Sequence, residues 1–253
     1  MPLEQRFIAG QGNAVHLASG KMVDREVSLP PTERIYENQG NLPLIKLLDG
    51  SRHRVLDIGC GAGDNAALIR SRDSNCEISG ITHSAAEAER AQIHMKKCWV
   101  INIEEEFPDE LLRQSFDVQI FSHVLEHLRN PATVVARFSP LLHKGGQVLI
   151  AVPNILSLRM RLQFLRGDFR YQSSGPLDDT HLHFYTYLTA DQCLLSEASD
   201  LKLTHKVVSG SVPLWLLRRH IFPTAWSKHI DEWGSHHWPN LFGGQVLIRA
   251  VKE

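Results

Sequence analysis

The feature that most constrains this chain is a glycine-rich stretch at residues 56–64. It follows the apolar residues 55–58, and residues 65–70 have the composition of a helix. A strand, a glycine turn and a helix in this order form a nucleotide-binding loop, because glycine lets the backbone turn sharply and approach a ligand closely. A bare turn between a strand and a helix is the alternative interpretation of the same residues.

The spacing of the glycines argues against a dinucleotide site. That fingerprint, G-x-G-x-x-G, places a pyrophosphate at the N-terminus of the following helix. Gly59 and Gly61 fit the pattern, but Asp64 stands where the third glycine belongs. A carboxylate at that position would repel a pyrophosphate, and it suits a ligand whose nearby end is cationic.

Alternating strand and helix signals after residue 50 predict an α/β fold with a largely parallel sheet. The predicted strands are residues 55–58, 77–81, 99–101, 116–121, 147–152, 203–208 and 245–251. A capping box of Ser84 and Glu87 begins the second helix, and Gly145 and Gly146 are expected to end a helix that spans residues 132–142. Further helices are predicted at residues 156–166 and after Thr189.

The composition limits the classes of function. With 253 residues, 43% of them hydrophobic, the chain can bury one substantial core with appendages. A net charge of -1 provides no general attraction to nucleic acid or to an anionic membrane. The first residues lack the order of a signal peptide, the apolar runs are too short to span a bilayer, and the four cysteines form no C-x-x-C pair. We therefore expect a cytoplasmic enzyme.

The spacing Asp57-x-Gly59-x-Gly61-x-Gly63 resembles motif I of the class I S-adenosylmethionine-dependent methyltransferases. Their cofactor carries an amino group and a sulfonium and no phosphate, which fits a carboxylate beside the loop. The resemblance covers roughly residues 33–205 and implies a Rossmann-like, seven-stranded, mostly parallel sheet with helices on both faces and an antiparallel last strand. It also implies that Asp57, Gly59, Cys60, Gly61 and Gly63 border the methionine part of S-adenosyl-L-methionine.

Residues after the second and third strands are the next expected cofactor contacts. The family usually has an acid after the second strand that binds both ribose hydroxyls, and here Thr82 and His83 stand at that place. After the third strand Asn102 replaces the usual Asp toward the adenine amino group, with the apolar Ile103 beside it. The alternative interpretation of Asn102 is an ordinary loop-capping residue.

Ser122 and His123 follow the fourth predicted strand and are expected to line the cofactor pocket. His123, Glu126 and His127 also match the H-x-x-E-H motif of zinc peptidases, but that motif belongs on a well-formed helix and here it begins at a strand end. The stretch resembles instead a signature of small-molecule methyltransferases, above all the ubiquinone-biosynthesis O-methyltransferases, which can use a divalent metal there. A structural role is favoured and no metal is predicted, with a metal on His123, Glu126 and His127 as the open alternative.

Residues 177–186 provide the candidate catalytic group. They resemble a Leu-Asp-x-Thr-His stretch of one methyltransferase subgroup, often of glycan, lipid or secondary-metabolite pathways, and a related methionine-biosynthesis family. Methyl transfer is an in-line displacement that mainly needs a positioned acceptor, and an oxygen acceptor must also lose a proton. His181 is therefore the candidate general base, with Asp178 or Asp179 orienting its imidazole. Alternatively, His181 only bridges Asp178 and a backbone carbonyl.

Taken together, these residues predict transfer of a methyl group to a small-molecule acceptor, at a hydroxyl oxygen, with no nucleic-acid partner. Residues 1–50 are expected to form an N-terminal helical flap, and residues 51–253 a methyltransferase domain with substrate-lid insertions at about 155–188 and 211–242. A carboxylate or nitrogen acceptor is an alternative. So is a non-catalytic protein that binds the cofactor or a partner enzyme, because Thr82 and Asn102 replace two acids. The sequence does not indicate an oligomeric state.

Overall fold

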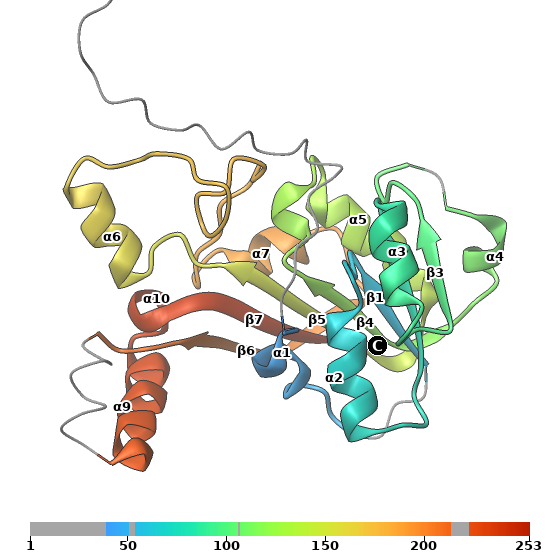
Figure 1. Cartoon of the computed structure of the whole chain (residues 1–253), viewed down its shortest axis with the longest axis horizontal. Helices are drawn as coiled ribbons and strands as arrows, with labels where there is room; N and C mark the ends of the chain where they lie inside the picture. Colours follow the sequence, from blue (N-terminus) through green and yellow to red (C-terminus); the bar gives the residue numbers. More distant parts are fainter. Residues whose placement is uncertain (1–38, 51–53, 106, 214–222) are drawn as a thin grey trace, which may run out of the picture.

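The computed structural model describes residues 39–50, 54–105, 107–213 and 223–253. One seven-stranded sheet runs through this part of the chain in the order β3-β2-β1-β4-β5-β7-β6 (Figure 1). The pairs along β3, β2, β1, β4 and β5 are parallel, whereas β7 is antiparallel to both β5 and β6. The strands are β1 Arg54–Ile58, β2 Glu77–Thr82, β3 Lys97–Val100, β4 Phe116–Ser122, β5 Leu142–Pro153, β6 Leu201–Gly210 and β7 Gly243–Lys252. The sheet and its antiparallel last strand confirm the predicted fold.

Helices cover both faces of this sheet, because the central strands alternate two sets of apolar side chains. Ile120 of β4 belongs to the core beneath α1 and α2, and its neighbour Phe121 to the core beneath α5. Phe121 and Phe138 meet edge to face with ring centroids 5.8 Å apart. The helices are α1 Leu42–Ile45, α2 Asp64–Arg72, α3 Ala85–Ala91, α4 Asp109–Leu112, α5 Pro131–Phe138, α6 Leu158–Leu165, α7 Ala190–Leu194, α9 Thr224–His237 and α10 Pro239–Phe242.

The predicted end of the helix before β5 is wrong. Helix α5 stops at Phe138, a 3-10 turn (η3) follows at Ser139–Leu141, and Gly145 and Gly146 lie within β5. Pro140 explains the early stop, since proline has no N–H and its ring clashes with the preceding helical turn.

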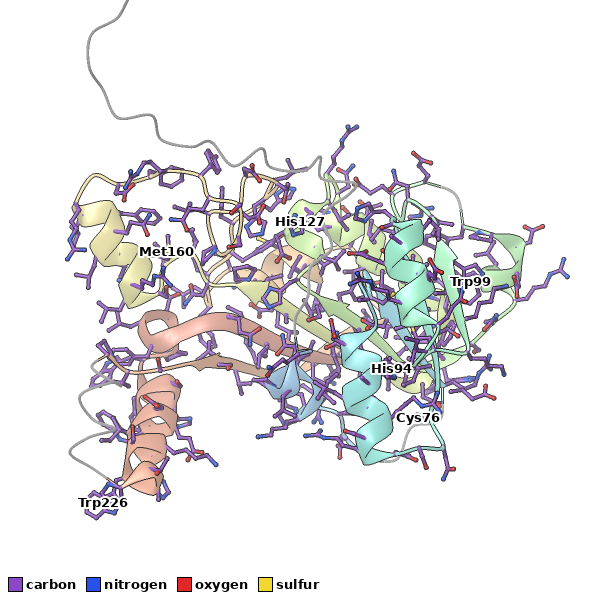
Figure 2. All side chains as sticks on the ribbon, in the orientation of Figure 1. Cys76, His94, Trp99, His127, Met160 and Trp226 are labelled. Carbon is purple, nitrogen blue, oxygen red and sulfur yellow. The ribbon has the colours of Figure 1, made fainter. Side chains whose placement is uncertain are left out.

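The predicted flap and lids are only partly within the described residues. Residues 1–38 of the flap and residues 214–222 of the second insertion lie outside them, and the flap's described part contains α1. The first insertion contains α6, and its later part lies against the turn after β4, where Leu182 and His183 donate backbone hydrogen bonds to Glu126. Helix α9 extends away from the sheet beside β6, and Figure 2 shows Trp226 near its outer end. Their action as lids stays a prediction.

Candidate functional site

The glycine loop joins the carboxyl end of β1 to helix α2. Gly59, Gly61 and Gly63 have φ angles of 74°, 52° and 91°, a left-handed conformation that other residues rarely adopt. A Cβ on Gly59 would lie 2.6 Å from a methyl carbon of Val124, which follows β4. A Cβ on Gly61 would meet nothing within 4 Å. The loop is therefore closely packed at its base and open at its tip, as a ligand-binding loop requires.

Asp57 is a buried carboxylate that accepts no hydrogen bond within the described part of the chain. Its side chain is fully buried, and neither carboxylate oxygen has a hydrogen-bond partner among the described residues. Burial raises the pKa of Asp57 to about 7, although the nearby side chain of Asn65, outside hydrogen-bonding geometry, lowers it. An unpaired buried charge is unfavourable unless a cation or a donor meets it. The base of the loop therefore suits a ligand that brings a positive charge.

Cys60, the loop residue between Gly59 and Gly61, is held beneath the loop. Its Sγ lies 3.6 Å from the Sγ of Cys98 on β3. The hydrogen bond with Cys98 and burial raise the pKa of Cys60, so the residue stays an uncharged thiol. Cys60 therefore supports the loop from below and adds no charge to the site.

A carboxylate that the sequence analysis missed lies at the end of β2. The buried Thr82 hydroxyl donates to Glu87 Oε2 at 2.5 Å, and Glu87 is 3% exposed. The predicted capping box is half formed, because Ser84 Oγ accepts from the Glu87 backbone while the Glu87 carboxylate turns back to Thr82. The first turn of α3 thus brings a carboxylate to the end of β2, and the ribose contact of Thr82 and His83 stays a prediction. His83 is exposed and lies beside this pair in the chain.

The side chains of Asn102 and Ile103, which follow β3, contact their own loop and the core. Asn102 Nδ2 donates to Glu105, and Asn102 Oδ1 accepts from the Glu104 backbone at 3.1 Å. Ile103 is 7% exposed and belongs to the core. These contacts are those of the loop-capping alternative, and the adenine contact stays a prediction.

Ser122 and His123 belong to a network that ties β4 to α1 and β7. Ser122 Oγ accepts from Asn41, and His123 Nε2 lies 2.9 Å from Gln245 Oε1. His123 has a φ of 54°, which places its ring between Gln245 and Glu126 Oε1, the latter 3.3 Å from Nδ1. Burial lowers the pKa of His123, but the hydrogen bond to Glu126, the charge of Glu126 and the hydrogen bond to Gln245 together outweigh burial and raise the pKa. This arrangement matches the favoured structural role.

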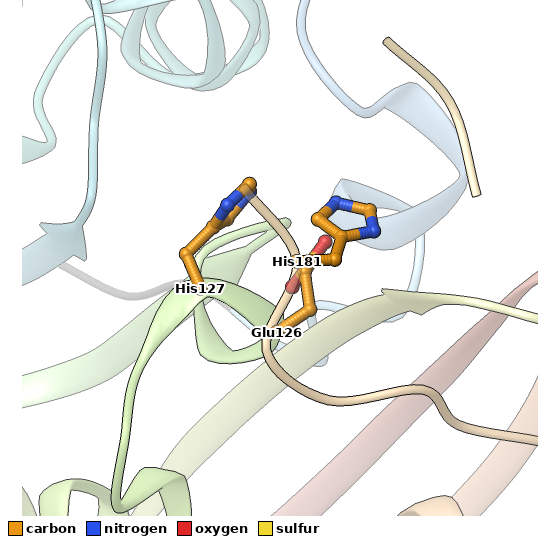
Figure 3. Close-up of side chains that lie close together, drawn as sticks. All are labelled: Glu126, His127 and His181. Carbon is orange, nitrogen blue, oxygen red and sulfur yellow. The ribbon is translucent and has the colours of Figure 1, made fainter. Parts of the chain in front are cut away.

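His127 and His181 come together beside the buried carboxyl group of Glu126 (Figure 3). Glu126 and His127 lie on the 3-10 turn η2, Leu125–His127, and the two rings are nearly perpendicular with centroids 4.6 Å apart. One ligand atom from each of the three residues lies within 4.8 Å of the others, a spacing that would admit a divalent cation. The sequence analysis left open a metal on His123, Glu126 and His127, whereas the set in the structure contains His181 in place of His123. The prediction of no metal remains untested.

Asp178 contacts Thr180 in the structure, and the orientation of His181 by Asp178 or Asp179 stays a prediction. Asp178 Oδ1 accepts from the Thr180 backbone at 2.9 Å and from the Thr180 hydroxyl at 2.6 Å. His181 Nδ1 lies 3.3 Å from the Pro176 carbonyl oxygen. Asp178 thus caps its own turn, with its Oδ1 directed to Thr180. Through Thr180, Asp178 reaches His127, whose Nδ1 is 2.9 Å from the hydroxyl.

Comparison with known proteins identifies the family. A family model described as a methyltransferase domain matches residues 32–206. The chain belongs to this methyltransferase family. Membership confirms the resemblance read from motif I, and with it an S-adenosylmethionine-dependent methyltransferase domain. None of the helices in the described residues is long and apolar enough to cross a membrane.

Two curated relatives and one solved structure are similar to this chain. The ubiquinone biosynthesis O-methyltransferase of Acinetobacter baylyi is 30% identical over 40% of this chain and 44% of its own length. The (S)-tetrahydroprotoberberine N-methyltransferase of Eschscholzia californica is 30% identical over 70% of this chain and 49% of its own. The chain thus spans less than half the length of these relatives. A plantazolicin methyltransferase solved with a desmethyl analogue and SAH shares the fold, with a TM-score of 0.52 at 14% identity, covering 83% of this chain and 80% of its own.

The residues at the loop fit S-adenosylmethionine. The cofactor has a cationic amino group and a sulfonium, and Asp57 offers a buried carboxylate that makes no hydrogen bond with the residues that the structure describes. The open tip at Gly61 leaves room for a ligand against the backbone. The methyltransferase's Asp57 and glycine loop would therefore hold the amino-acid end of the cofactor.

Proposed function

We propose that this methyltransferase transfers a methyl group from S-adenosylmethionine to a hydroxyl oxygen of a small organic acceptor. The observation that carries the proposal is the unpaired, buried Asp57 at the base of a glycine loop. Both curated relatives are named as methyltransferases of small molecules, one at oxygen and one at nitrogen. A nitrogen acceptor is the second candidate, favoured by the wider coverage of the N-methyltransferase.

Cofactor binding is assigned to the end of β1, and proton acceptance to the turn after the adjacent strand β4. When bound, S-adenosylmethionine supplies an electrophilic methyl carbon. Asp57, near the end of β1, would accept hydrogen bonds from the cationic amino group, and the glycine loop would hold the cofactor against its backbone. The neighbouring strand β4 leads into the turn that carries His127, and His181 lies against that ring. An imidazole at this place takes the hydroxyl proton of the acceptor, as expected for His181 from the sequence.

The same reasoning gives the remaining parts of the proposal. The acceptor is a small molecule and not a nucleic acid, since the net charge of -1 provides no field for a polyanion. The four cysteines are all free thiols, two of them with sulfurs 3.6 Å apart, which suits the reducing cytoplasm. We place the enzyme in that compartment.

The test is calorimetric titration with S-adenosylmethionine and S-adenosylhomocysteine. We expect micromolar binding by the wild type, a loss of at least about tenfold in Asp57→Asn, and no change in Asp109→Asn, whose carboxylate is exposed on α4. A screen of phenols, catechols and amines with methyl-labelled cofactor then identifies the acceptor atom. Equal binding by the wild type and Asp57→Asn would refute the proposed cofactor site. Binding without transfer to any acceptor would favour the non-catalytic alternative.

A further inference from the structure

A chain of hydrogen bonds connects His127 to a buried carboxylate. The Thr180 hydroxyl lies 2.6 Å from Asp178 Oδ1 and 2.9 Å from His127 Nδ1. A threonine hydroxyl has one hydrogen to donate, and an ionised carboxylate can only accept. The hydrogen therefore goes to Asp178, and the hydroxyl oxygen accepts from His127.

This arrangement fixes the tautomer of His127. Because Nδ1 carries the hydrogen, the lone pair of the neutral ring is on Nε2. A neutral ring in this tautomer can accept a proton at Nε2. We call the hydrogen-bonded chain of His127, Thr180 and Asp178 the relay. Asp178 is 3% exposed, and its carboxylate lies at the buried end of the relay, where a negative charge would stabilise a protonated His127.

The position of His127 also suits the reaction. It ends the turn that follows β4, and the Val124 side chain at the start of this turn packs against Gly59 of the loop. His127 is thus anchored to the element that would hold the cofactor. The Nδ1 of His181 lies 3.3 Å from the Pro176 carbonyl oxygen, which can fix the tautomer of this ring but carries no negative charge to stabilise an imidazolium. With centroids 4.6 Å apart, the two rings do not both take a proton easily.

We propose that His127 takes the hydroxyl proton of the acceptor, and that Thr180 and Asp178 are positioning residues that hold its ring. This assignment rests on the proposed function. The O–H bond of the acceptor breaks and the proton moves to Nε2 of His127. The oxygen keeps the electron pair and forms the bond to the methyl carbon, while the pair of the broken C–S bond stays on sulfur. His181 forms the wall beside the reacting hydroxyl.

The relay can be tested without knowing the acceptor, by nitrogen NMR of the full chain with labelled histidine and bound S-adenosylhomocysteine. We expect His127 to carry its hydrogen on Nδ1 in the wild type and in Thr180→Ser, and to lose this preference in Thr180→Val. A wild-type His127 with its hydrogen on Nε2 would overturn the relay. Thermal unfolding of each variant shows that the fold is kept.

Kinetics with a catechol, 3,4-dihydroxybenzoate, test the proton transfer. We expect His127→Ala to lower kcat at least about a hundredfold with little change in KM, and added imidazole to restore part of it. Thr180→Val lowers kcat about tenfold and Thr180→Ser restores it, whereas His181→Gln raises KM. The exposed His143→Gln is the matched control.

The outcomes separate this assignment from the proposed function. A loss of kcat in His181→Gln that exceeds the loss in His127→Ala assigns the proton to His181 and overturns the inference. Activity that a chelator abolishes and Zn²⁺ restores replaces the base with a metal at Glu126, His127 and His181, which also overturns it. Absence of cofactor binding, or of transfer to any hydroxyl, refutes the proposed function, while the NMR result still decides whether the relay exists.

Discussion

Asp57→Asn should make the protein more stable and weaken cofactor binding at least about tenfold at the same time. The carboxylate lies at the end of β1, fully buried and without a partner among the described residues. An amide of the same shape removes the charge but keeps the volume. A buried charge that destabilises the free protein can be kept in evolution because the ligand supplies the hydrogen-bond donor or cation that the charge lacks.

The size of the effect follows from the pKa. Burial raises the pKa of Asp57 from 3.8 to about 7, a difference of about 3 units. At 1.36 kcal/mol per unit, the ionised side chain lowers the free energy of unfolding by about 4 kcal/mol above pH 7. Because the folded pKa is the higher one, this loss is absent below pH 4 and grows as the pH rises to 7. About 3 kcal/mol of it appears between pH 5 and pH 8.

The assay is urea unfolding of the wild type, Asp57→Asn and the surface control Asp109→Asn at pH 5 and pH 8. The amide variant should exceed the wild type in stability by a margin that widens by about 3 kcal/mol from pH 5 to pH 8, as the pKa difference requires. Asp109→Asn should follow the wild type at both pH values. A margin that is the same at pH 5 and pH 8 would refute the reasoning, since it would show that Asp57 does not titrate between them.

Two further predictions concern the loop and the end of β2. Gly61→Ala should weaken cofactor binding but lower the free energy of unfolding by only about 1–2 kcal/mol, because its Cβ enters open space at a φ of 52°. Gly59→Ala should lower the free energy of unfolding far more, because its Cβ meets Val124 at 2.6 Å. Equal stability losses would show that the loop tip is not open. Thr82→Val removes the hydroxyl that donates to the buried Glu87 and should lower the thermal stability by about 1–3 kcal/mol, while an unchanged melting temperature would mean that Glu87 finds another donor.

Much of the sheet could be predicted because each of its strands has a local signal. Residues 148–152 are continuously apolar, and residues 116–121 are apolar apart from Asp117 and Gln119, as expected of strands covered on both faces; the structure has β5 and β4 there. The wrong end predicted for the helix before β5 came from taking a pair of glycines as the end of the helix. Gly145 and Gly146 resemble a helix end, but Pro140 had already stopped the helix.

The candidate site was predictable only where one segment makes it. The glycine loop and Asp57 are consecutive, so their pattern shows in the sequence, and Glu87 could have been found from the capping box that begins at Ser84. The relay joins His127 to Thr180, which are 53 positions apart in the chain. Single-sequence spacing favoured Asp178 with His181, because nothing local shows that the turn directs Asp178 to Thr180.

The pH dependence of ligand binding can show which cationic group Asp57 meets. S-adenosylmethionine and S-adenosylhomocysteine share the amino group, and only the first has a sulfonium. If Asp57 meets the amino group, both ligands should lose affinity alike, by about tenfold or more, as the pH falls from 8 to 5 and the carboxylate with a pKa of about 7 takes up a proton. Calorimetry at both pH values measures this, with Asp57→Asn as the variant that should show no such dependence. A loss confined to S-adenosylmethionine would place the sulfonium at Asp57 and contradict the assignment, because methyl transfer would then remove the charge that the buried carboxylate binds.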